Sequence, residues 1–156
     1  MPLLTTRRFT LLLASGALVT SLVLTACGGG NSGTPASADP YGWTAVTALK
    51  TADTVVGTGA TAAAGAKATV NYTGYIYDVR ASDTRGTKFD AGSFQFTLGA
   101  TPLAVIAGFD QGVTGMKVGG KRTLTIPASL GYGTAGYASI PGGAALVFDV
   151  ELTAVN

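Results

Sequence analysis

Aromatic side chains are the residues of this chain whose types and spacing could support chemistry. Ten of its thirteen aromatic residues lie within positions 72–148. Aromatic residues at strand spacing usually belong to a hydrophobic core, and we expect that position for Phe96. Phe89, Tyr132 and Tyr137 are instead expected in turns of glycine-rich stretches, where core packing explains them less well. These three residues are therefore the first candidates for a functional role.

The residue types that the chain lacks exclude most other chemistry. It contains no histidine, which removes histidine general acid–base catalysis, Ser-His and Cys-His dyads and histidine-ligated metals. Its single cysteine excludes internal disulfides, CxxC redox chemistry and thiolate zinc sites. We therefore expect neither a metal nor a cofactor. The function must belong to an enzyme that works without these groups, or to a binding domain.

The first 26 residues have the pattern of a secretory signal. Two arginines precede residues 9–24, which are uncharged and mostly apolar. The motif LTAC at residues 24–27 is similar to a bacterial lipobox, in which cleavage precedes an acylated cysteine. We expect residues 1–26 to be a lipoprotein signal peptide and Cys27 to carry the lipid. A plain signal peptide with an incidental cysteine and an uncleaved anchor are the alternatives.

A spacer and a folded domain are predicted after the signal. Residues 28–40 are mostly small and polar, with glycine and proline, a composition that cannot bury enough surface to order itself. We expect residues 27–40 to be the acylated cysteine and a flexible tether, and residues 41–156 to be one domain. Without the signal peptide the chain has 10 − 2 = 8 basic and 8 acidic side chains. This balance, without a basic stripe, argues against a nucleic-acid partner.

Period-two alternation predicts a β-rich domain from residue 41 onward. Strands are expected in residues 68–76, 94–98, 123–126 and 146–153, with a weaker strand within 44–56. One short, glycine-interrupted helix is expected near residues 107–115, and an extended polar loop over residues 78–86. An antiparallel sheet that keeps one polar face can cover its other face with such a helix. The pattern therefore predicts an α+β domain.

Short motifs follow one another across residues 45–154. The first is VNYTGY at residues 70–75. GTKFD, FQFTLG, VIAGFDQGV and GMKVGGKR follow at residues 86–90, 94–99, 105–113 and 115–122. The series closes with IP at 126–127, GYG at 131–133, IP at 140–141 and LVFDVEL at 146–152. In composition and order this series resembles the FKBP-type peptidyl-prolyl isomerases.

The resemblance implies an FKBP-like antiparallel β-sheet wrapped around one short α-helix, with an apolar pocket. It implies catalytic roles for Tyr72, Phe89, Asp90, Phe109 and Tyr132. It implies substrate-binding roles for Phe94, Val105, Ile106, Tyr137, Ile140 and Phe148. Phe109 would form the floor under the proline ring, and the Ile106 N–H and the Tyr132 hydroxyl would hold substrate carbonyls. Phe109 stands where the family usually has tryptophan, so the strength of the activity stays open.

The function implied by the resemblance is peptidyl-prolyl cis-trans isomerisation in folding proteins, with the twisted amide bound in an aromatic pocket and no covalent step. Its implied partners are proline-containing polypeptides and macrolide inhibitors of the rapamycin type. The alternative is a proline-peptide-binding module of FKBP fold with little or no turnover. The lipobox-like motif implies an exported lipoprotein of the bacterial cell envelope, anchored through Cys27 and facing the periplasm. Gly28 favours the outer membrane.

Overall fold

The computed structural model of the protein describes residues 39–156. The predicted signal peptide 1–26, the predicted lipid attachment at Cys27 and the tether up to residue 38 lie outside these residues. In the described part of the chain, no helix has the length and the apolar character needed to cross a membrane.

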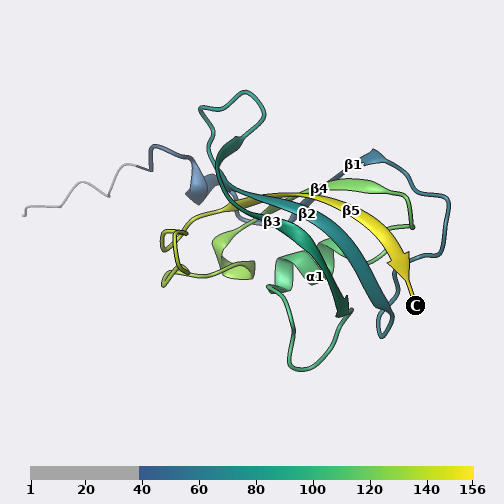
Figure 1. Ribbon diagram of the computed structural model, residues 1–156. Helices are drawn as coiled ribbons and strands as arrows, with labels where there is room; N and C mark the ends of the chain where they lie inside the picture. Colours follow the sequence, from purple (N-terminus) through teal and green to yellow (C-terminus); the bar gives the residue numbers. More distant parts are fainter. Residues whose placement is uncertain (1–38) are drawn as a thin grey trace, which may run out of the picture. The chain divides into compact units, whose positions relative to one another are not determined.

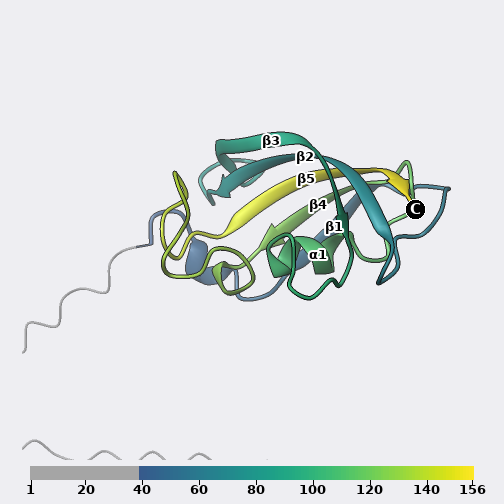
Figure 2. The same cartoon turned by 60° about the horizontal axis from the view of Figure 1, so that its bottom comes forward.

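Five strands form one antiparallel sheet (Figure 1). They are β1 (Lys50–Val55), β2 (Lys67–Tyr77), β3 (Arg85–Thr97), β4 (Lys121–Ile126) and β5 (Leu146–Val155), in the spatial order β1-β4-β5-β2-β3. The helix α1 (Ala107–Val113) lies on one face of this sheet, as Figures 1 and 2 show. Two 3-10 helices, η1 (Trp43–Ala45) and η2 (Ala128–Leu130), precede β1 and follow β4. The predicted α+β fold is confirmed.

The alternation along β5 explains why the sheet has an apolar and a polar face. Leu146 and Phe148 are at most 4% exposed and share one core cluster with apolar residues of α1. Asp149 and Glu151, at the alternate positions, stay partly exposed. Fully burying one such apolar side chain contributes about 1.5–3 kcal/mol. The central strand therefore holds the core on the helix side and leaves charged groups on the other side.

Two glycines allow α1 to lie close to β4. A Cβ atom at Gly108 would stand 2.4 Å from Ile126 Cγ2, and one at Gly112 would stand 2.7 Å from Leu124 Cδ1. Glycine costs a helix about 1 kcal/mol relative to alanine, but here a larger residue would push the helix off the sheet. The helix ends at Val113, two residues earlier than predicted.

Strand β3 differs most from the sequence prediction. The sequence predicts a loop over residues 78–86 and a strand only from residue 94, whereas β3 begins at Arg85 and contains Phe89. The pairing of β2 with β3 shifts register twice, between Gly74 and Tyr75 and between Tyr75 and Tyr77. Each shift interrupts the period-two pattern by which a strand is recognised in a sequence. The prediction that Phe89 lies in a turn was therefore wrong.

Candidate functional site

A cavity of about 270 Å³ opens between the sheet, the start of α1 and two loops. Ten residues line it: Tyr72, Phe89, Asp90, Phe94, Ala104, Val105, Ile106, Phe109, Tyr132 and Phe148. Six of them are aromatic, and they come from β2, β3, β5, α1 and the loop after η2. The fold thus gathers rings from distant parts of the chain around one hollow.

Phe109 lies at the centre of this ring cluster. It stands in the first turn of α1 and is only 3% exposed. The ring centroids of Phe94, Phe96 and Phe148 lie 5.7, 5.8 and 5.3 Å from its own, and the Tyr72 ring lies edge-on at 6.2 Å. Favourable aromatic pairs have centroids about 4.5–7 Å apart. The base of the cavity is therefore a well-packed aromatic layer, with Phe96 behind it in the core as predicted.

A β-bulge turns two consecutive residues of β3 toward the cavity. Gly74 pairs with Asp90 and Tyr75 pairs with Lys88, so Phe89 has no partner on β2. Neighbours in a regular strand point to opposite faces, but the extra residue of a bulge removes this constraint. Phe89 and Asp90 consequently both line the cavity.

The polar rim is built around a hydrogen bond between β2 and β3. The Tyr72 hydroxyl donates to Asp90 Oδ2 at 2.5 Å, and Asp90 Oδ1 accepts a bond from the Ala91 N–H at 2.9 Å. The bond to Asp90, followed by burial, raises the pKa of Tyr72 to about 12. Tyr72 is therefore a neutral donor at physiological pH. Asp90 therefore makes a local backbone contact and also has a place on the cavity rim.

Two hydrogen-bond donors of the cavity are left for a ligand. The Ile106 carbonyl accepts bonds from the N–H groups of Phe109 and Asp110 at the start of α1, but within residues 39–156 the Ile106 N–H itself makes no hydrogen bond. The Tyr132 hydroxyl likewise has no protein partner among the described residues, and burial raises its pKa. Both residues line the cavity together with the Tyr72–Asp90 pair.

The structure brings nine of the eleven predicted site residues together and leaves two outside the cavity lining. Tyr137 is 65% exposed and stacks on Tyr132, with ring centroids 5.2 Å apart. Ile140 is 6% exposed and belongs to the core. The two residues form an antiparallel bridge with backbone hydrogen bonds of 3.0 and 2.8 Å. Sequence reasoning missed Ala104, a residue too small and too common to stand out.

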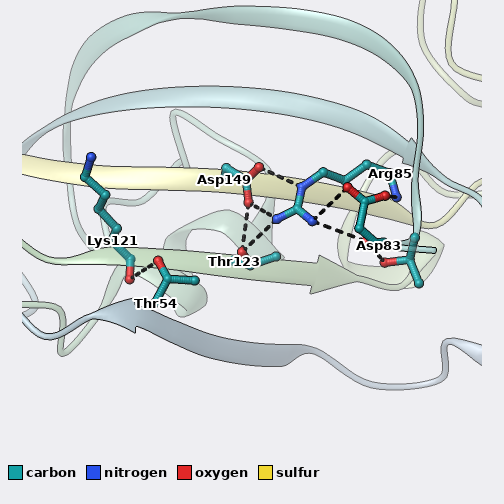
Figure 3. A network of polar contacts seen from close by, with 7 residues as sticks. Thr54, Asp83, Arg85, Lys121, Thr123 and Asp149 are labelled. Carbon is teal, nitrogen blue, oxygen red and sulfur yellow. Dashed lines mark hydrogen bonds and ion pairs between the residues drawn. The ribbon is translucent and has the colours of Figure 1, made fainter. Parts of the chain in front are cut away.

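A larger hollow, of about 380 Å³, lies over the polar face of the sheet. Arg85 dominates it, binding Asp149 through Nη2 at 2.6 Å and through Nε at 2.8 Å (Figure 3). Thr123 donates to the same carboxylate at 2.8 Å. Lys121 lies 3.6 Å from Glu151. Because these charges satisfy one another, this hollow offers a ligand no free charge, and we assign the site to the smaller aromatic cavity.

Comparison with known proteins shows a family match and similar relatives. Residues 59–153 match the model of the family described as FKBP-type peptidyl-prolyl cis-trans isomerase. FK506-binding protein 2B of Rhizopus delemar is 47% identical over 98 residues, which cover 59% of this chain and 43% of that protein. The FK506-binding protein of Neisseria meningitidis serogroup C is 45% identical over 103 residues, covering 62% of this chain and 86% of that protein. The chain spans less than half the length of the Rhizopus relative.

Solved structures agree with the fold. FkpA from Escherichia coli matches with a TM-score of 0.59 and 35% identity, over 70% of this chain and 49% of that one. AtFKBP13 matches with a TM-score of 0.58 and 31% identity, over 69% of this chain and 93% of that one. The sheet, the helix α1 and the ring-lined cavity therefore define an FKBP-fold domain. The chain belongs to the FKBP-type peptidyl-prolyl cis-trans isomerase family.

Proposed function

We propose that the protein is a peptidyl-prolyl cis-trans isomerase that binds Xaa-Pro segments of folding polypeptides in the aromatic cavity. The observation that carries this proposal is the cavity itself, which is lined by six rings, the nearly buried Phe109 among them, and by two donors that have no partner within residues 39–156. Uncatalysed Xaa-Pro isomerisation takes tens to hundreds of seconds and can limit folding. A catalyst of this step would act on proline-containing chains in general.

The proposed mechanism needs no proton transfer and no covalent intermediate. Rotation about a peptide bond must break amide resonance, which costs about 18–20 kcal/mol. The twisted amide has less charge separation than the planar one, so transfer from water into an apolar cavity disfavours the planar form more. Complementarity to the twisted form then lowers the barrier. The lack of histidine in the chain is no obstacle to this chemistry.

Each part of the cavity has a distinct proposed role. Phe109 supports the proline ring from below, and the walls include Phe94 and Val105. The Ile106 N–H and the Tyr132 hydroxyl donate to carbonyls of the bound peptide and hold its backbone while the Xaa-Pro bond turns. The Tyr72–Asp90 pair forms the polar rim. Tyr137 takes part indirectly, by stacking on Tyr132, and Ile140 supports the loop from the core.

The experiment is a cis-to-trans relaxation assay on a short Xaa-Pro peptide with the full chain in detergent. We expect acceleration that a macrolide of the FK506 or rapamycin type abolishes. The names of the relatives as FK506-binding proteins support this choice of inhibitor. A folded protein that binds the peptide without accelerating its relaxation would instead identify a proline-peptide-binding module, the alternative function.

The N-terminal segment supports a second, independent proposal about location. Residues 1–26 act as a signal peptide, Cys27 is acylated, and residues 27–40 tether the domain of residues 41–156 to a membrane of the bacterial cell envelope. The only cysteine of the chain ends the lipobox-like motif, and Gly28 favours the outer membrane on the periplasmic side. Labelling with a radioactive fatty acid in a bacterial host tests this. We expect label and membrane fractionation in the native protein and neither in Cys27→Ser.

A further inference from the structure

A third hollow, the aromatic groove, lies at the β2–β3 hairpin. We define it by Tyr41, Trp43, Arg80, Gly86, Thr87 and Pro141, and its volume is about 200 Å³. These residues come from the segment ahead of β1, the β2–β3 hairpin and the loop that leads to β5. The proposed isomerase mechanism uses none of them.

The walls of the aromatic groove are held in place without a ligand. The Tyr41 and Trp43 rings stack with centroids 4.8 Å apart. The Trp43 indole N–H donates to the Tyr77 carbonyl at 2.7 Å, and the Val79 N–H donates to the Tyr41 carbonyl at 3.0 Å. Gly42 between the two rings has φ = 75°, in the left-handed region that favours glycine. Both aromatic residues nevertheless remain partly exposed.

The groove presents flat surfaces and no uncompensated charge. The Arg80 guanidinium lies over the Tyr41 ring, 4.5 Å from its centroid. Asp78 binds the same guanidinium through two hydrogen bonds, of 2.8 and 2.7 Å. A charged ligand would therefore have to compete with the ion pair between Arg80 and Asp78. Trp43 and Arg80 already cover the Tyr41 ring, so an incoming group would contact the outer plane of the Arg80 guanidinium, whose side chain is 59% exposed. Such a plane favours an uncharged aromatic ring.

The position of the groove relates it to the catalytic cavity. Gly86 and Thr87 in the groove precede Phe89 and Asp90 in the cavity along β3. Pro141 belongs to the loop whose start carries Tyr132 of the cavity. A polypeptide bound by its proline in the cavity can therefore extend along β3 toward the groove.

We propose that the aromatic groove is a second docking site for client polypeptides, which accepts an aromatic side chain of the same chain whose proline occupies the cavity. This inference rests on the proposed isomerase function, because it assigns a second contact to the same client. Two contacts on one chain reinforce each other, since the first raises the effective concentration of the second. The groove would thus favour unfolded clients, which expose aromatic residues, over short proline peptides.

The test compares peptides that differ only in one residue. Each contains one Xaa-Pro bond and either phenylalanine or alanine at about three to about eight residues from the proline, on the order of 10 to 26 Å of extended chain. With the full chain in detergent, we expect kcat/KM about tenfold higher for the phenylalanine peptide at the best spacing. Tyr41→Ala and Arg80→Ala should remove this gain and leave the alanine peptide unchanged. Val56→Ala, at a 73% exposed position outside the groove, is the control and should keep the gain.

A second measurement does not depend on turnover. Trp43 is the only tryptophan of the chain, so its emission reports on the groove directly. We expect the phenylalanine peptide, but not the alanine peptide, to change this emission, and Tyr41→Ala to abolish the change. Circular dichroism would verify that each variant is folded.

The outcomes separate the inference from the proposed function. Equal turnover of both peptides at every spacing, with unchanged Trp43 emission, would overturn the groove as a docking site and leave the isomerase intact. Failure to accelerate either peptide, with a Tyr41-dependent emission change, would overturn the isomerase and support the groove as a peptide site. Absence of both signals would overturn both.

Discussion

The Phe89 ring occupies the space directly beside the α-carbon of Gly74. A Cβ atom at Gly74 would stand 2.6 Å from Phe89 Cζ and 2.9 Å from Phe148 Cε1. Gly74 also marks the position on β2 where the pairing with β3 shifts register. The bulge that turns Phe89 toward the cavity and the glycine that receives its ring thus form one structural unit.

Gly74→Ala should therefore damage both stability and activity. The added methyl group must displace two packed rings, and overpacking of this kind typically costs about 1–3 kcal/mol. We expect a loss of that size in the free energy of unfolding, measured by urea denaturation, with reduced isomerase activity. Gly92→Ala on the facing strand is the matched control, because its nearest new contact, to Tyr72 Cε1, is an ordinary 3.5 Å. Equal effects of the two substitutions would contradict the argument.

Phe109→Leu should reduce activity in a protein that still folds. Leucine keeps the floor apolar and close in volume, a change that usually costs less than about 1.5 kcal/mol. It removes the ring that makes aromatic contacts with Phe94 and Phe148 and that would support the proline. We expect kcat/KM to fall about tenfold, equivalent to about 1.4 kcal/mol. An unchanged kcat/KM in a folded variant would show that Phe109 is not the floor under the proline.

The Tyr72–Asp90 bond predicts a loss of stability at alkaline pH. The folded protein keeps the Tyr72 proton up to a pKa of about 12, whereas tyrosine normally has a pKa of 10.0. Between these values the folded state holds more protons than the unfolded state, so stability is complete below pH 10 and falls as the pH rises toward 12. Urea titrations across this range should show a shallower fall for Tyr72→Phe than for the native protein. Identical slopes would argue against the raised pKa.

The Arg85–Asp149 pair predicts a loss of stability at acidic pH. Hydrogen bonds from Arg85, and to a lesser extent from Thr123, hold the pKa of Asp149 below 3.8. As the pH falls, the unfolded state therefore takes up a proton before the folded state does. The stabilisation from the Arg85–Asp149 pair is complete above the ordinary aspartate pKa and is lost as the pH falls through the lowered pKa. Asp149→Asn should flatten the acid limb of the unfolding free energy against pH.

Glu151→Gln is the matched control for that measurement. Glu151 lies on the same strand and face, but its ion pair with Lys121 is longer, at 3.6 Å, and more than a third of each side chain is exposed. Exposed pairs of this kind typically contribute about 0–1 kcal/mol. We expect the acid limb of this variant to resemble that of the native protein, and an equal flattening in both variants would refute a special role for the Arg85–Asp149 pair.

Much of the fold could be predicted because its signals are local. From Phe148 to Thr153, β5 alternates between the core and the polar face, and the stretch around Phe109 is short and glycine-interrupted. Its two glycines are consistent with the close contact between α1 and β4. The first part of β3 was not predicted, because bulges in its pairing with β2 break the alternation of apolar and polar residues. A bulge depends on how two strands pair rather than on the residues of one strand.

The sequence by itself determined the chemistry that this protein can use and the ordered set of residues from which its cavity is built. The tertiary structure decided which of those side chains meet. It placed Phe89 in a strand, sent Ile140 into the core and left Tyr137 stacked on Tyr132. It also brought Tyr41 and Trp43 to the β2–β3 hairpin to form the aromatic groove. These outcomes follow from register and from packing between segments far apart in the chain, and a linear pattern of residue types does not encode either one locally.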